Sequence, residues 1–323
     1  MTTLALGAAI VGVLIAPHCI PSQRISTTAG IVLWSSTLLL RAVLGLSLVV
    51  VLLFVVPATE SFALLTRWCL QTVLPFLTSH LDLNGHGLGD VAVVVPGVLI
   101  AASLLSLVVG TWRGARSARR WVGRNQLGLG PGASVIISGS DVFVAAAGLR
   151  SPQVVISAGA LVSLDDAELK AGLEHEWGHV RRRHRFISVA AHACRAVSPF
   201  LPLGKRALEQ LHLHLERDAD DYAVSRTGDP LALASAICKA AAGPMSRSAG
   251  IAALGGPGSS VSERLRRLSG PGHEVGRAMS TASAALATTT IALVLLLGAA
   301  TSAVASADLH RVAEAQPGHA AEC

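Results

Sequence analysis

Long apolar runs mark several stretches of the chain as predicted membrane helices. Residues 282–306 are 25 residues without a charge, and residues 91–110 are 20 more. A helix of about 20 apolar residues crosses a hydrocarbon core of about 30 Å. Residues 31–56 are long enough too, although they contain Arg41, which we expect to snorkel toward an interface rather than face the bundle interior. The run 3–16 is predicted as a first helix, because it has no basic leader and no clear cleavage site.

The charges between these runs predict their orientation. Five arginines follow the run 91–110, whereas the charged residues of the loop before it are Glu60, Asp82 and Asp90 against Arg67 alone. Lys and Arg accumulate on the cytoplasmic side of membrane proteins, so we expect the arginine side to be cytoplasmic and both chain ends to be extracytoplasmic. The apolar segment 62–81 contains Arg67 and Pro75, and whether it crosses the membrane stays open.

These runs divide the chain into four predicted regions. They are an N-terminal membrane region (1–111), a cytosolic domain (112–281), a C-terminal transmembrane helix (282–306) and a short disordered extracytoplasmic tail (307–323). We therefore expect a multi-pass cell-membrane protein that is mainly α-helical, with about four transmembrane helices.

The predicted cytosolic domain has mixed periodicity. β-branched and small apolar runs at 134–138, 142–147 and 153–157 predict a small sheet. Ser163 is the expected N-cap of a helix that continues to Ser198, and a Pro-containing turn precedes a second helix over about 205–226. The domain is thus predicted to be α+β.

Composition agrees with a membrane protein. The chain is 51% hydrophobic and 14% charged, with a mean hydropathy of +0.56. Its five scattered cysteines form no C-x-x-C pair and suggest no disulfide framework. The net charge of +6 comes largely from arginines beside apolar runs, so we expect them to face anionic lipid headgroups and expect no nucleic-acid binding.

The strongest chemical signal is the run His175-Glu176-Trp177-Gly178-His179, an H-E-x-x-H arrangement. Positions i and i+4 share one helix face, so the two imidazoles can bind the same zinc ion, with Glu176 beside the metal. The motif places zinc chemistry on the first predicted helix of the domain.

The second predicted helix carries the residues that would complete such a site. Glu216 and Asp220 are four apart and share a face. A peptidase zinc needs three protein ligands and one open position, which Glu216 can complete, and Asp220 can accept a hydrogen bond from a ligand histidine. Without the H-E-x-x-H motif, a solvated acidic helix face would be the favoured interpretation of this stretch, and the motif reverses that preference. His212 and His214, two apart on the same helix, do not suggest a second metal site.

Several motifs together resemble integral membrane zinc metallopeptidases of the gluzincin type. The stretches that carry the resemblance are 154–161, 165–169, 175–183, 216–221 and 262–268. The arrangement of three spans, a cytosolic domain and a last span is similar to the BlaR/MecR-type antirepressor peptidases. His184 is instead similar to the related heat-shock membrane proteases and CAAX prenyl endopeptidases. Only residues 307–323 follow the last predicted span, so we do not expect this chain to carry the antirepressors' extracellular sensor.

The resemblance, with the spacing, implies a mechanism. His175, His179 and Glu216 would bind Zn²⁺, and Glu176 would act as the general base. Tyr222, His184 and Arg264 are candidates for stabilising the oxyanion, and strand 142–147 for holding the peptide backbone.

The expected activity is regulatory cleavage of a cytosolic or membrane-proximal protein, such as a transcriptional repressor. One alternative is quality control of membrane proteins. The other is a non-catalytic zinc-binding scaffold, which would not need Glu176.

Overall fold

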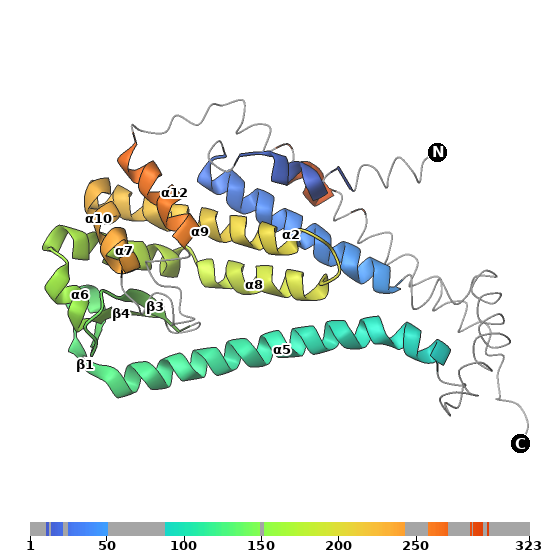
Figure 1. Cartoon of the computed structure of the whole chain (residues 1–323), viewed down its shortest axis with the longest axis horizontal. Helices are drawn as coiled ribbons and strands as arrows, with labels where there is room; N and C mark the ends of the chain where they lie inside the picture. Colours follow the sequence, from blue (N-terminus) through green and yellow to red (C-terminus); the bar gives the residue numbers. More distant parts are fainter. Residues whose placement is uncertain are drawn as a thin grey trace, which may run out of the picture.

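The computed structural model describes residues 11–50 with short gaps, 88–148, 152–242, 258–270 and a few positions between 285 and 296. Helices α2 (Thr27–Val50), α8 (His184–Val197) and α9 (Gly204–Thr227) pack against one another. Helix α5 (Leu88–Asn125) runs along the other side of α8 and ends at the sheet (Figure 1). The predicted spans 3–16 and 282–306, segment 62–81 and the tail lie wholly or largely outside the described residues.

A small mixed sheet forms one end of the molecule. Its strands are β1 (Gln126–Leu129), β2 (Val135–Ile137), β3 (Val144–Ala147) and β4 (Gln153–Ser157), in the order β1-β2-β4-β3. Strand β4 is parallel to β2 and antiparallel to β3. The three predicted strands are present, and β1, which the sequence analysis missed, continues directly from α5. The described part of the sheet leaves β3 at an edge.

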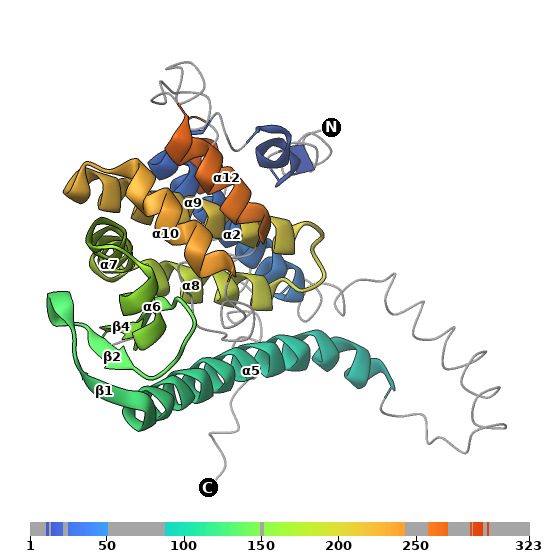
Figure 2. The same ribbon diagram turned by 60° about the vertical axis from the view of Figure 1, so that its left-hand side comes forward.

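The two faces of the sheet are covered by different helices. Val144, Ala146, Val154 and Ile156 face a core built with α7 (Asp166–Arg181), α10 (Pro230–Ala242) and α12 (Gly258–Ser269). The opposite face packs against Trp121 and Val122 near the end of α5. The second view shows α7 and α10 above the sheet and α5 below it (Figure 2). Burial of both faces explains why the strands have almost continuous apolar runs.

The start of α7 differs from the prediction. Ser163 is the last residue of a short helix, α6 (Ala158–Ser163). The N-cap of α7 is Asp165, whose carboxylate accepts from the Glu168 backbone amide at 2.8 Å. The Glu168 carboxylate accepts from the Asp165 amide at 2.9 Å, which completes a capping box. The Ser163 assignment was therefore wrong, because α6 ends there.

The predicted continuous helix through to Ser198 is also interrupted. Helix α7 ends at Arg181, Arg183 adopts a left-handed conformation (φ 56°), and α8 begins at His184. The predicted Pro-containing turn is present between α8 and α9. The break lets α8 leave α7 in a new direction and bend back beside α9.

Two described helices have the properties of membrane spans. Within α2 the segment Thr27–Val49, and within α5 the segment Val98–Asn125, are long and apolar enough to cross a membrane by length and composition. Half of the most apolar part of α2 is buried by other helices, whereas α5 is almost entirely exposed along its apolar part. These two helices suggest membrane association.

Arg41 does not snorkel as expected. It is buried on α2 and lies beside Gly204, the first residue of α9. The expectation was wrong because α8 and α9 cover this face of α2, which turns the arginine into the protein interior.

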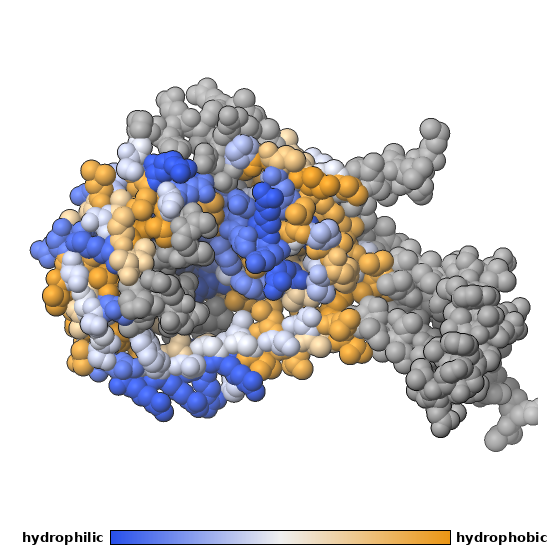
Figure 3. Space-filling view, in the orientation of Figure 1, coloured by the Kyte–Doolittle hydropathy of each residue, from blue (hydrophilic) through white to orange (hydrophobic). Residues whose placement is uncertain are grey.

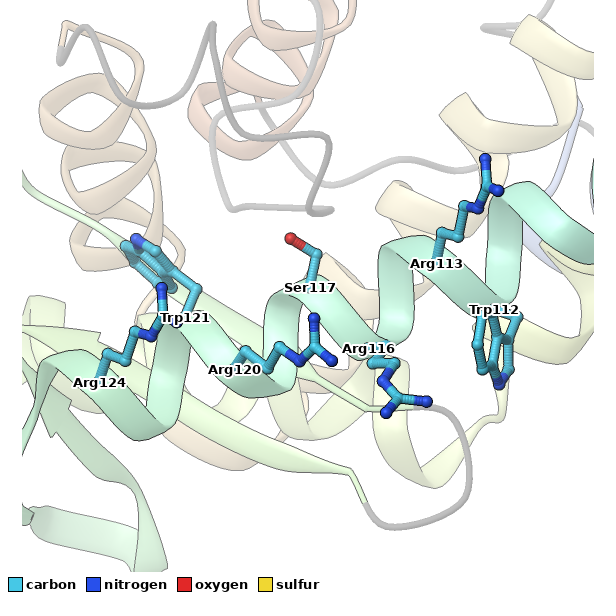
Figure 4. Close-up of a pocket in the computed structure, with 7 residues that line it drawn as sticks. All are labelled: Trp112, Arg113, Arg116, Ser117, Arg120, Trp121 and Arg124. Atoms are coloured by element: carbon cyan, nitrogen blue, oxygen red, sulfur yellow. The ribbon is translucent and has the colours of Figure 1, made fainter.

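Helix α5 continues well beyond the predicted span without a break. Its arginines after residue 112 are exposed, and four of them border an open hollow with Trp112 and Trp121 (Figure 4): Arg113, Arg116, Arg120 and Arg124. The Arg116 guanidinium lies 5.2 Å from the centre of the Trp112 ring. The surface is hydrophilic where α5 reaches the sheet and more hydrophobic along much of α2 (Figure 3).

Candidate metal centre and active site

The H-E-x-x-H helix and the Glu216 helix meet at their small residues. A Cβ atom built on Gly178 would lie 3.2 Å from the Ala219 Cα and 3.2 Å from the Tyr222 Cβ. Gly178 and Ala219 therefore allow α7 and α9 to approach closely enough for their functional side chains to converge. Both helices also contribute to the buried core, so tertiary packing fixes their relative position.

The predicted ligands lie together and have the spacing that zinc requires. The two Nε2 atoms of His175 and His179 are 3.2 Å apart, and each lies 3.5 Å from a carboxylate oxygen of Glu216. Tetrahedral zinc with bonds of about 2.1 Å separates its ligand atoms by about 3.4 Å. The three side chains form a group that could hold a metal ion, and they leave a fourth position for water or substrate.

Asp220 lies directly behind the first histidine. Its Oδ1 is 2.9 Å from Nδ1 of His175, so Nε2 of that ring is directed toward the other ligands. A carboxylate in this position fixes the tautomer of a ligand histidine and increases its basicity. Asp220 thus lies beside His175, and its role in holding a ligand histidine stays a prediction.

Arg264 of α12 connects two acidic residues of α9, Glu216 and Asp220. Its Nε and Nη2 donate to the Asp220 carboxylate at 2.9 and 2.7 Å, and its Nη1 lies 2.9 Å from Oε2 of Glu216. The arginine side chain is fully buried. Arg264, one of the three oxyanion candidates, therefore pairs with both carboxylates.

Glu176 points toward the edge strand. Its Oε2 accepts a hydrogen bond from the Ala146 amide of β3 at 2.7 Å, and the residue is 1% exposed. Phe143, three residues earlier, instead pairs with Ser157 at the end of β4. The Ala146 N–H is thus on the outer side of β3, and the general-base candidate lies next to a strand edge that an extended peptide could join.

Burial and neighbouring charges set the protonation states of Glu176, Glu216 and His179. Burial raises the pKa of Glu176 to about 7, within the range of a general base. Burial acts in the same direction on Glu216, but His179 and Arg264 outweigh it and hold that pKa at about 2. Burial lowers the pKa of His179 to about 3, so its ring is neutral at pH 7 and able to ligate. Glu216 is ionised, as a metal ligand must be.

His175 differs from the second ligand histidine. Burial lowers its pKa, but the contacts with Asp220 and Glu216 outweigh burial and raise the pKa to about 9. In the metal-free protein the pair of His175 and Asp220 therefore holds a proton that an incoming metal must displace.

The other two oxyanion candidates, His184 and Tyr222, both contact residues of α7. Nδ1 of His184 is 2.9 Å from Nδ1 of His179, and its Nε2 is 2.9 Å from Asp218. The Tyr222 ring packs between Gly178 and the guanidinium groups of Arg181 and Arg182. The sequence analysis missed Asp218, because the acidic run around it gives no sign of which carboxylate faces inward.

Comparison with known families agrees with this geometry. Residues 133–253 match the model of Peptidase family M48, and this region contains strands β2, β3 and β4, helices α7 and α9, and all three potential ligands. No curated protein and no solved structure matches the chain. The matched domain and the His-His-Glu group support a metallopeptidase, a class that is typically zinc-dependent.

Proposed function

We propose that this protein is an integral membrane zinc endopeptidase whose site consists of His175, His179 and Glu216 as ligands and Glu176 as general base. The observation that carries this proposal is the near-tetrahedral spacing of the three ligand atoms beside a buried Glu176. A purely structural zinc site would more often have a fourth protein ligand and would not need this carboxylate.

The chain's own residues would perform the proton transfers. Bound zinc would supply a Lewis acid that polarises the scissile carbonyl and acidifies water. Glu176 accepts the proton of the attacking water and returns it to the leaving amine. Asp220 and Arg264 hold the ligand side chains in place. The substrate backbone lies along the outer edge of β3, beside Ala146.

The decisive experiment replaces Glu176 with glutamine, with Glu174→Gln on the same helix as the matched control. Glu174 lies near Arg226 and outside the ligand group. We expect Glu176→Gln to keep stoichiometric zinc but lose about 10²- to 10⁴-fold in cleavage of an unfolded protein substrate. Retained proteolysis in this variant would show that the assigned mechanism is wrong.

The third ligand has a test of its own. Glu216→Gln should lose zinc by elemental analysis, whereas Glu209→Gln, an exposed position on α9, should keep it. Full zinc occupancy in Glu216→Gln would mean that another residue completes the site.

The finer proposal is that the peptidase cuts a cytosolic or membrane-proximal protein in regulatory proteolysis, with a transcriptional repressor as the model target. The likeness to the antirepressor motifs and the two apolar helices support it. Comparing the protein termini produced by the wild type and by Glu176→Gln would test it. New termini confined to damaged membrane proteins would favour quality control instead.

A further inference from the structure

We propose that His184, backed by Asp218, is a positioning residue that holds His179 in the tautomer needed to bind zinc. This inference rests on the proposed function and assigns to His184 a role different from oxyanion stabilisation. It begins with an asymmetry between the two ligand histidines. Nδ1 of His175 faces a carboxylate at 2.9 Å, whereas Nδ1 of His179 faces another imidazole nitrogen at 2.9 Å.

The contacts define one arrangement of protons along this chain of groups. Nε2 of His179 is directed toward His175 and Glu216, so it must be bare to ligate. The His179 proton is then on Nδ1, which donates to Nδ1 of His184. That acceptor atom is bare in turn, so the proton of His184 is on Nε2 and donates to Oδ2 of Asp218 at 2.9 Å.

Asp218 is well suited to fix the outer end of this chain. Its other carboxylate oxygen accepts from the Arg182 guanidinium, and this ion pair favours the ionised carboxylate. An ionised carboxylate can only accept, so it selects the His184 tautomer with the proton on Nε2. His184 itself is 3% exposed, and both of its ring nitrogens are engaged away from the open ligand position.

The backbone break after α7 makes this contact possible. In a continuous helix, residue 184 would be about 140° around the axis from residue 179, because five residues turn about 500°. The left-handed Arg183 ends α7 and begins α8, which returns the His184 ring to the back of His179. A left-handed conformation is uncommon for a residue with a side chain, and the contact it permits lies beside the metal site.

The predicted consequence is a weaker zinc site when the acceptor behind His179 is lost. Outer partners of metal ligands are commonly worth 10- to 100-fold in metal affinity. His184→Phe removes both nitrogens and should lower zinc affinity by about that factor. His184→Asn places an oxygen near the former Nδ1 and should recover most of the loss. His184→Gln reaches the former Nε2, near Asp218, and should remain as weak as His184→Phe.

The experiment measures zinc affinity of the full-length protein in detergent by competition with a chromophoric chelator at one pH. His192→Phe is the matched control, since His192 lies on the same helix and bonds to the Ser188 carbonyl, away from the ligands. Thermal unfolding of the metal-free variants reports whether each one is folded.

Zinc affinity that decreases from the wild type to His184→Asn and further to His184→Gln would support the inference. Equal zinc affinity in the Asn and Gln variants, or wild-type affinity in His184→Phe, would overturn it. Should His184→Phe fail to fold, the Asn and Gln variants still decide the question. A wild type that binds no zinc would instead refute the proposed function itself.

Discussion

Replacing Arg264 with methionine is expected to destabilise the metal-free protein at neutral pH, and much less in acid. The arginine side chain is fully buried, donates twice to Asp220 and lies 2.9 Å from Glu216. Removing one partner of a buried ion pair costs about 3–5 kcal/mol, because the remaining charge stays in a low-dielectric interior. His175 still faces Asp220, so we expect about 3 kcal/mol, a decrease of about 6–12 °C in the melting temperature.

The pH dependence separates lost charge from lost packing. Burial raises the pKa values of Asp220 and Glu216, but their cationic neighbours, Arg264 among them, outweigh burial and depress both. A depressed carboxyl pKa stabilises the folded state above the unfolded pKa of about 4, and this stabilisation is lost as the pH falls further. The difference between Arg264→Met and the wild type should therefore shrink below about pH 4.

Thermal unfolding of the two proteins, followed by circular dichroism at pH 7 and again near pH 3, would measure this difference. Arg266→Met on the exposed face of α12 is the control and should behave like the wild type. An equal loss at both pH values would refute the electrostatic reasoning and indicate a packing defect.

Three further predictions follow from other contacts. Glu168→Gln should lower the free energy of unfolding by about 1–3 kcal/mol at pH 7, as measured by chemical denaturation. The loss should be smaller below pH 4, because Lys239 and the helix cap outweigh burial and lower the pKa of Glu168. Apparent zinc affinity should rise about tenfold per pH unit from pH 7 to about 9, because zinc displaces the proton of the His175 site. Calorimetry in buffers of different ionisation enthalpy should detect the release of this proton. A Cβ on Gly30 would lie 2.3 Å from the His214 ring, so Gly30→Ala should cost about 1–3 kcal/mol and His214→Ala should recover part of it in a double-mutant cycle.

Local periodicity was sufficient to predict the metal-binding group. His175 and His179, like Glu216 and Asp220, are four residues apart on a helix, and this spacing alone places each pair on one face. That the two helices would pack together could be expected only from the chemistry of a three-ligand site.

Roles that depend on contacts between distant elements could not be predicted in the same way. Arg264 reaches Asp220 across 44 residues, and His184 reaches Asp218 across 34. No spacing rule connects such pairs, so both residues looked like equal candidates for the oxyanion. Arg41 was misjudged for a similar reason, because its surroundings depend on which face of α2 the α8 and α9 helices cover.

The position of Arg264 in the chain affects the order in which the site is completed during synthesis. A ribosome releases His175, Glu176 and Glu216 well before it releases α12. Until that helix folds back, the nascent chain carries the acidic cluster without its shared cation, and the carboxylates repel one another. Arg264 therefore joins the site only after nearly the whole domain has been translated.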